Sequence, residues 1–359
     1  MITEQNLTPL ITETIHAVLP SDQGAAKYTK KRWDSIAKPL NSLGIFEKIL
    51  TGIAGTQRTP AITLQGRTLI VFCSDNGIVA ENVSQTGQDV TAKVAANLAC
   101  EKATAAIFCR EADVKILPVD VGMIHDVDIR TEKQAYGTKN FAAEDAMTRE
   151  EALKTIETGI RLAKERAEAG DHILMIGEMG IGNTSTSSAV ASVLLQVPVS
   201  EITGRGAGLS DSGLAHKREV LTQAIKERRP DPSDPVDVLA KVGGFDIAAM
   251  TGLILGAAAL KIPVILDGFI SAVGALAAVR MCPAAGDCLV PSHSSSEPGA
   301  DVVLNALQMQ APVQANMRPG EGCGAVLLLK ILDMILHIYQ EMPTFEDIAI
   351  EAYQPYSER

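Results

Sequence analysis

Short apolar runs recur along the chain and are separated by longer segments of helical periodicity. Five such runs are rich in Val, Ile and Leu and lack polar alternation: 67–73, 114–120, 172–176, 262–266 and 289–290. Runs of this kind are typical of strands that are buried on both faces of a parallel sheet. Strands that alternate with helices imply right-handed βαβ crossovers. The pattern therefore predicts an α/β fold with a doubly wound, mainly parallel sheet.

Periodicity and turn residues also predict the main helices. Thr148, followed by Glu151 three residues later, is typical of a capping box and begins a helix over 148–169, which Gly170 ends. Residues 122–147 are weakly patterned and are expected to form a loop. The other predicted helical segments are 1–59 with punctuation at Pro39 and Gly44, Asp89 to about Cys109, a Gly/Ala helix over 242–259, and 325–339.

Small polar or acidic residues occur repeatedly where the predicted strands end. They are Asp75, Asp120, Glu178, Asp267 and His293. The carboxyl ends of parallel strands lie at one edge of a sheet, where open α/β proteins bind their ligands. Five such residues at one edge predict a pocket there.

The most informative stretch is 176–190, IGEMGIGNTSTSSAV, which follows the third run. Gly177, Gly180 and Gly182 allow backbone N–H groups to approach a ligand, and the next helix begins among hydroxyl side chains. Free N–H groups at a helix N-terminus bind anions such as phosphate. Glu178 lies inside this segment, so the ligand is expected to have both an anionic and a cationic part. The alternative is an ordinary strand-to-helix turn with a Ser/Thr cap.

Further candidates carry two interpretations each. Glu321, between Gly320 and Gly322, is either a general base or an acidic residue that complements a helix dipole. Lys217 either binds a phosphate or is a solvated helix lysine. Asp267 either belongs to the pocket or caps the helix that opens at Gly268. His293 is either a proton carrier or a satisfied hydrogen-bonding group, and the second is favoured.

Composition excludes several classes of protein. The 359 residues are 46% hydrophobic, with a net charge of −11 and no Lys/Arg cluster, so nucleic-acid binding is not expected. The six cysteines and six histidines lack metal-ligand spacing, which indicates a reduced, metal-free, cytoplasmic protein. The N-terminus is unlike a secretion signal, and no run is long enough to span a membrane; residues 247–260 come closest. No P-loop or GxGxxG motif follows a strand, so a nucleoside triphosphate or dinucleotide is not expected.

Ten motifs in a fixed order carry a resemblance to a known family. They are KPLNSLG, SDNG, GQDVTA, VDVG, GEMGIGNT, GRGAGLSDSGLAHK, DVLAKVGGFDIAAM, LDGF, PSHSSSEPGA and RPGEGCGA. Over about residues 28–340 the chain resembles the nicotinate mononucleotide:5,6-dimethylbenzimidazole phosphoribosyltransferases, which activate the lower ligand of cobamides. The resemblance implies transfer of 5-phosphoribose from nicotinate mononucleotide to an aromatic base, without a metal or other cofactor.

The resemblance also implies an architecture. A large Rossmann-like α/β domain is expected over 60–295. A small, mostly helical domain is expected from the two chain ends, 1–59 and 296–359. The family implies a dimer, and the partner is either a second copy or a paralogue.

Site residues follow from the residue patterns and the resemblance together. Glu321 matches the family's general base, Glu178 its second glutamate, and Lys217 its lysine after the second glycine loop. The residues expected at the phosphate and ribose are Gly180, Gly182, Asn183, Thr184, Gly206, Lys217 and Ser295. The residues expected at the aromatic base are Thr86, Val94, Met179, Pro319 and Gly320.

The chain departs from the family pattern around the base. Thr86 and Val94 stand where the family has a serine and a glutamine, and Pro319 stands where it has a leucine. These changes make the base pocket less polar and reshape it, while they leave the ribosyl chemistry intact. The resemblance implies 5,6-dimethylbenzimidazole or a related base, whereas a valine in place of the glutamine would suit a phenolic base. Two alternatives stay open: a subunit of a two-subunit phenol or p-cresol phosphoribosyltransferase, and a non-catalytic paralogue that binds the mononucleotide.

Overall fold

The fold is built around one six-stranded parallel sheet. The structure is a computed structural model and describes residues 6–353. The strands are β1 (Arg67–Ser74), β2 (Lys115–Gly122), β3 (Arg130–Thr131), β4 (Ile173–Met179), β5 (Val264–Leu266) and β6 (Leu289–Pro291). Their order across the sheet is β3-β2-β1-β4-β5-β6, with every pairing parallel. The predicted α/β class with a parallel sheet is confirmed. The order reverses between β1 and β4, which is where such sheets open a ligand crevice.

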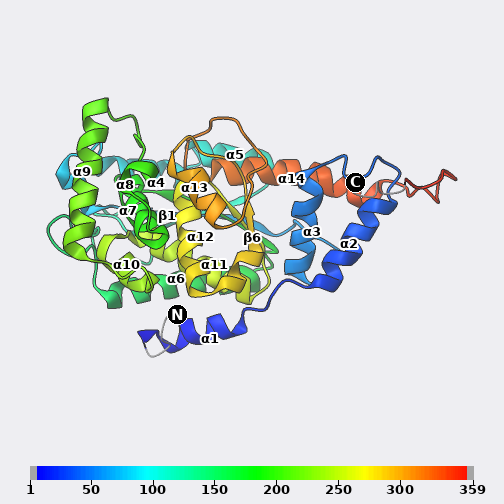
Figure 1. The fold of residues 1–359 in the computed structure, drawn as a ribbon, viewed down its shortest axis with the longest axis horizontal. Coiled ribbons are helices and arrows are strands. Elements are labelled where there is room, and N and C mark those ends of the chain that lie inside the picture. Colours follow the sequence, from blue (N-terminus) through cyan, green and yellow to red (C-terminus); the bar gives the residue numbers. More distant parts are fainter. Residues whose placement is uncertain (1–5, 354–359) are drawn as a thin grey trace.

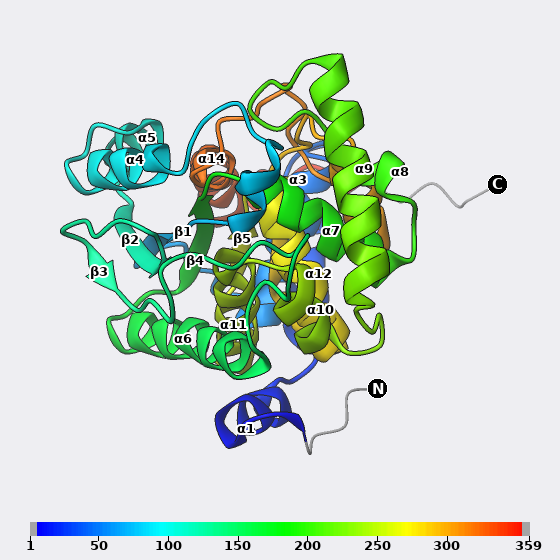
Figure 2. The same ribbon diagram turned by 90° about the vertical axis from the view of Figure 1, so that its left-hand side faces the viewer.

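The side chains of alternate residues in the central strands point to opposite faces of the sheet and pack into two separate hydrophobic cores. Ile70 and Phe72 of β1 enter one cluster, whereas Leu69, Val71 and Cys73 enter the other. The continuous apolar run of β1 is explained by this burial on both faces. Figure 2 shows the sheet between the two helix layers.

The first layer contains the helices whose buried residues belong to the same core cluster as Ile70 and Phe72. They are α1 (Pro9–Ala17), α6 (Arg149–Glu168), α7 (Asn183–Leu195), α8 (Val199–Ile202), α9 (Asp211–Arg228), α10 (Pro235–Val242), α11 (Phe245–Ala259), α12 (Phe269–Met281) and α13 (Gly299–Ala306). Helix α11 is the centre of this layer, since 14 of its 15 residues are buried.

Helices α6 and α11 touch through glycines. A β-carbon on Gly252 would lie 1.8 Å from the carbonyl oxygen of Ile156, and one on Gly159 would lie 2.1 Å from that of Ala249. Only a hydrogen at these positions lets the two backbones come this close. The Gly/Ala composition of α11 is therefore a packing requirement.

The second layer covers the other face of the sheet. It consists of α2 (Gln23–Ser35), α3 (Ile45–Gln57), α4 (Asp89–Ala99), α5 (Thr104–Ala112) and α14 (Cys323–Glu341). Two short 3₁₀ turns, Gly77–Glu81 and Pro283–Cys288, complete the elements. Figure 1 shows α14 running along one side of the molecule toward α2 and α3.

Two predicted helices are each interrupted in the structure. The predicted helix over 242–259 is wrong at its start, because Gly243 and Gly244 are extended and separate α10 from α11. A β-carbon on Gly244 would lie 2.4 Å from Asp246 Oδ1 and 2.7 Å from Asn76 Oδ1, so this extended position has room for glycine alone. The predicted helix from Asp89 to Cys109 is two helices, α4 and α5.

Two other local predictions hold. The capping box of α6 is present, with Thr148 and Glu151 each accepting a hydrogen bond from the other's backbone N–H. The segment 122–147 is mostly loop, although it contributes the two-residue strand β3. Both depend on neighbouring residues in the sequence, which is why the pattern alone predicted them.

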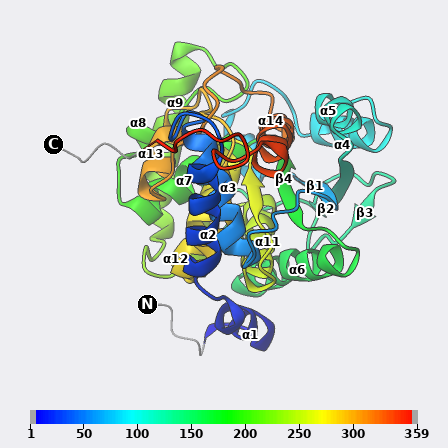
Figure 3. The ribbon, with the colours of Figure 1, turned by 90° about the vertical axis from the view of Figure 1, so that its right-hand side faces the viewer.

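The N-terminal and C-terminal segments pack together except for α1. Helices α2, α3 and α14 share one core cluster with the sheet, whereas α1 packs against α6 and α11 in the other layer. Figure 3 shows α1 set apart from α2 and α3. The division into domains 60–295 and 1–59 with 296–359 stays a prediction. Residues 1–5 of the N-terminus and the last six residues of the predicted small domain lie outside the described residues.

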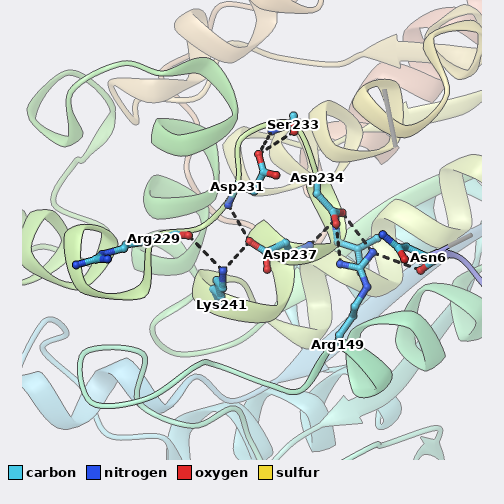
Figure 4. Close-up of polar contacts among 9 residues, drawn as sticks. Asn6, Arg149, Arg229, Asp231, Ser233, Asp234, Asp237 and Lys241 are labelled. Carbon is cyan, nitrogen blue, oxygen red and sulfur yellow. Dashed lines mark hydrogen bonds and ion pairs between the residues drawn. The ribbon is translucent and has the colours of Figure 1, made fainter. Parts of the chain in front are cut away.

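A polar cluster fastens the segment before α1. Arg149, at the start of α6, donates to Asp234 at 2.7 Å and to the carbonyl oxygen of Asn6 at 3.3 Å. Asp234 is also the N-cap of α10. Lys241 binds Asp237 at 2.9 Å, which in turn accepts from the backbone N–H of Asp231 (Figure 4). These contacts join α1, α6 and α10 at one end of the molecule.

Among residues 6–353, α14 is the one helix long and apolar enough to cross a membrane by length and composition. It is 56% buried inside the protein, as expected of a core helix. The segment expected to come closest, 247–260, is largely the shorter buried helix α11.

Candidate active site

A cavity of about 220 Å³ lies beyond the carboxyl ends of β4, β5 and β6. Three of the five polar residues expected at this edge line it: Glu178, Asp267 and His293. Asp75 and Asp120 do not, because they hold the loop after β2 instead. Asp75 accepts from the Ile124 N–H at 2.9 Å, and Asp120 pairs with Lys133 at 2.9 Å.

Most of the predicted site residues come together here. Those that line the cavity are Glu178, Met179, Gly180, Asn183, Thr184, Gly206, Ser295, Pro319, Gly320 and Glu321. Gly182, the N-cap of α7 with φ +93°, and Lys217 lie beside the cavity lining. Thr86 is exposed on the loop before α4, and Val94 packs half-buried in the same cluster as Met179. Neither lines the cavity, so their roles at the base stay predictions.

Three helices begin around this cavity. Helix α7 starts after Gly182, α12 after Gly268, and α14 after Gly322. Each N-terminus carries the positive end of a helix dipole. The start of α12, which brings Phe269, Ile270 and Ser271 to the wall, is absent from the sequence-based site. The rule that ligands gather after parallel strands, applied to β5, could have found it.

Lys217 is a buried residue, 1% exposed, so a solvated helix lysine is the wrong interpretation. Its Nζ donates to Thr184 Oγ1 at 2.9 Å, beneath the loop that contains Gly206. Burial lowers the pKa of Lys217 to about 8, partly offset by the negative charge of Glu297. Glu297 also lines the cavity and was not singled out from the sequence.

Glu178 lies on β4 and is buried. Asn183, at the first turn of α7, donates a hydrogen bond to its carboxylate. Burial raises the pKa of Glu178 well above its usual value, and the charges of Asp246 and Asp267 raise it further. A carboxyl group in this setting favours either a proton or a nearby cation.

Glu321 has an unusual backbone. Its φ is +61°, between Gly320 at +68° and Gly322 at +94°. A β-carbon on Gly177 would lie 2.3 Å from the Glu321 carbonyl oxygen, so the strand must have glycine there. Glycine adopts a positive φ without steric cost, so the strain falls on Glu321, and such strain is concentrated at functional sites.

The Glu321 side chain bridges to another element. Its Oε2 accepts from the Ala105 N–H at 3.1 Å, at the start of α5. Burial raises the pKa of Glu321, and the bond from Ala105 opposes that rise. The raised pKa lies nearer to neutral pH than that of a free carboxyl group, and a general base with such a pKa transfers protons more effectively.

Asp267 does not cap the helix that follows it in sequence. Its Oδ1 accepts from the Gly324 N–H at 2.7 Å and its Oδ2 from the Gly322 N–H at 3.3 Å, so it caps α14. Burial raises the pKa of Asp267 to about 7 despite these bonds. Asp267 therefore holds the turn that carries Glu321.

Within residues 6–353, no group of three or more His, Cys, Asp and Glu residues is arranged to hold a metal ion. All six cysteines are free thiols, and five of them are buried. The expectation of a reaction without metal or cofactor stays a prediction.

Comparison with known proteins agrees with this geometry. Residues 18–350 match the family described as Phosphoribosyltransferase. The nicotinate-nucleotide–dimethylbenzimidazole phosphoribosyltransferase of Ruminiclostridium cellulolyticum is 43% identical over 346 residues, which is 96% of this chain and 98% of the relative. The chain belongs to this family of phosphoribosyltransferases. The resemblance seen in the sequence motifs is thereby confirmed, and the protein is an enzyme of that class.

Two further similarities cover nearly the whole chain. The enzyme of the same description from Acetivibrio thermocellus is 45% identical over 329 residues, which is 91% of this chain and 94% of the relative. The crystal structure of CobT from Thermus thermophilus superposes with a TM-score of 0.87 at 32% identity, covering 92% of this chain and all of that chain. The fold of the chain is therefore that of the family.

Proposed function

We propose that this enzyme transfers 5-phosphoribose from nicotinate mononucleotide to 5,6-dimethylbenzimidazole or a related aromatic base. The products are the α-ribazole 5′-phosphate and nicotinate, for assembly of the cobamide nucleotide loop. One observation carries the proposal: buried Lys217 adjoins the same cavity that Glu178 and Glu321 line. Nicotinate mononucleotide likewise combines a phosphate with a cationic pyridinium ring.

The phosphate and ribose are placed at the start of α7. Gly180, Asn183 and Thr184 line the cavity and Gly182 is the N-cap of α7, so their N–H groups and side chains are proposed to bind the phosphate there. Lys217, held in place by its hydrogen bond to Thr184, adds a positive charge that attracts the phosphate. Gly206 and Ser295 complete the wall.

The proposed reaction needs three groups: the aromatic base as nucleophile, nicotinate as leaving group, and Glu321 as general base. A nitrogen of the incoming base attacks C1′ on the face opposite the pyridinium, and the C1′–N bond to nicotinate breaks as its electrons return to the ring. Glu321 takes the N–H proton of the incoming base, which leaves the product neutral at that nitrogen. Glu178 and the neighbouring carboxyl groups stabilise the positive charge at the ribosyl centre. The configuration at C1′ inverts from β to α.

Met179 and Pro319 form apolar walls of the cavity beside Gly320, and they are proposed to contact the aromatic base. We also carry over from the resemblance a dimer, with an identical or a paralogous partner, and a cytoplasmic location. Thr86 and Val94 are proposed to act at the base from the loop before α4 and from α4 itself.

Lys217 gives a prediction for the dependence on pH. Its pKa is about 8, so the charged form that attracts the phosphate predominates below pH 8 and is lost as the pH rises through that value. We expect kcat/KM for nicotinate mononucleotide to fall above pH 8, since this ratio reports groups of the free enzyme. In Lys217→Arg the value at pH 7 falls, but the decline above pH 8 disappears because a guanidinium stays protonated. A decline that persists in the Arg variant would assign it to another group.

The function is tested by measuring nicotinate release from nicotinate mononucleotide. Dimethylbenzimidazole, benzimidazole, adenine and phenol are supplied in parallel reactions. We expect release with the benzimidazoles. Release only with phenol, or only after a second chain is added, would place the enzyme in the phenolic branch. Binding of the mononucleotide without release from any base would make it a non-catalytic paralogue.

A further inference from the structure

His293 occupies a tightly defined position at the edge of the cavity. It follows β6, where a bridge to Val313 fixes its backbone, and it is 4% exposed. Its ring packs against the start of α14, since a β-carbon on Gly324 would lie 2.0 Å from His293 Nδ1. The glycine is therefore required for the imidazole to sit there.

The hydrogen bonds of Ser292 determine the tautomer of His293. Ser292 Oγ donates to the carbonyl oxygen of Asp267 at 2.7 Å, which uses its one proton. The same Oγ lies 3.1 Å from His293 Nδ1, so it accepts there and Nδ1 carries the hydrogen. Burial lowers the pKa of His293, which keeps the ring neutral. Nε2 is therefore an unprotonated hydrogen-bond acceptor.

His293 lines the cavity together with Gly268 and Ser295, and its Nε2 is on the side of the ring near both residues. Nε2 and Cε1 lie 3.5 Å from the position that a β-carbon on Gly268 would take, and Ser295 Cβ lies 3.4 Å from it. No donor from residues 6–353 pairs with Nε2. An acceptor in a ligand cavity is satisfied by a donor on the ligand.

Few groups on the substrates can donate. At neutral pH the carboxylate and pyridinium of nicotinate mononucleotide have no proton to give, and its phosphate is largely a dianion. The remaining donors are the 2′- and 3′-hydroxyls of the ribose and the N–H of the incoming base, which is assigned to Glu321. We propose that His293 Nε2 accepts a hydrogen bond from a ribose hydroxyl and makes the enzyme select ribosyl over deoxyribosyl donors. This inference rests on the proposed function.

Two substitutions separate the roles of the two ring nitrogens. In His293→Asn the amide nitrogen can replace Nδ1–H and keep the bond to Ser292, but nothing replaces Nε2. In His293→Gln the longer side chain can place its amide oxygen, an acceptor, near the position of Nε2. The Asn variant thus isolates the loss of the acceptor, and the Gln variant tests its rescue.

The experiment compares kcat/KM for nicotinate mononucleotide with that for its 2′-deoxy and 3′-deoxy analogues. We expect the wild-type enzyme to lose about tenfold or more with one analogue. His293→Asn should lose about as much with the ribosyl substrate and no longer distinguish it from that analogue. His293→Gln should recover part of the discrimination.

Unchanged discrimination in a folded Asn variant overturns the proposal, even if its activity falls. So does a wild-type enzyme that treats both analogues like the ribosyl substrate. If His293→Asn does not fold, His293→Leu takes its place: lost discrimination supports the role of Nε2, and wild-type discrimination overturns it. If the wild type releases no nicotinate at all, the proposed function fails, and calorimetric binding of the three mononucleotides still tests His293 by the same ratios.

Discussion

Replacing Glu321 by Gln is expected to lower kcat for phosphoribosyl transfer about 10²- to 10⁴-fold while the fold stays intact. An amide cannot take the proton from the attacking base, so the incoming nitrogen stays a poor nucleophile. Gln has the same length as Glu, and its oxygen can still accept from the Ala105 N–H that Glu321 binds at 3.1 Å. The start of α5 therefore keeps its partner, and the loss is specific to proton transfer.

The measurement is the initial rate of nicotinate release across pH, together with the melting temperature. In the wild type the rate should fall as the pH drops through the pKa of Glu321, which burial raises, because the base must be deprotonated to act. That acid limb should be absent in Glu321→Gln. Glu341→Gln, at the exposed end of α14, is the matched control and should leave the rate unchanged. A rate in Glu321→Gln within about threefold of the wild type would remove Glu321 from the general-base role.

Gly252→Ala is expected to lower the free energy of unfolding by roughly 3 kcal/mol. The new methyl group would meet the carbonyl oxygen of Ile156 at 1.8 Å, so α6 and α11 must separate. Backbone atoms of two packed helices cannot give way as a flexible side chain can. The free energy of unfolding in denaturant measures the effect.

Gly52→Ala is the matched control, because Gly52 is also inside a helix but nothing lies within 4 Å of its β-carbon position. Alanine favours a helix more than glycine does, so this variant should be more stable by about 0.5–1 kcal/mol. If both variants shift stability in the same direction, close packing of α6 on α11 is not what requires Gly252.

Local features of the fold were predictable from the sequence. The buried run of β1 and the capping box of α6 depend on residues that are adjacent along the chain, so the pattern contains their cause. The break at Gly243–Gly244 was not predictable, because Gly244 packs against Asn76, which follows β1 and is far away in the sequence. Propensity gives way to tertiary packing at such a position.

Some features of the candidate site were likewise predictable from the sequence, and others were not. The family and the glycine-rich strand ends could be read from the sequence, since those depend on residue types in order. The resemblance implied that Glu178 and Glu321 act together, and the folded chain brings both to one cavity. The folded protein was needed to show that Lys217 is buried beneath Thr184, that Asp267 caps α14 rather than α12, and that Ser292 sets the tautomer of His293. Burial and hydrogen-bond partners set the charge state of each group, and both come from segments far apart in the chain that meet only in the folded protein.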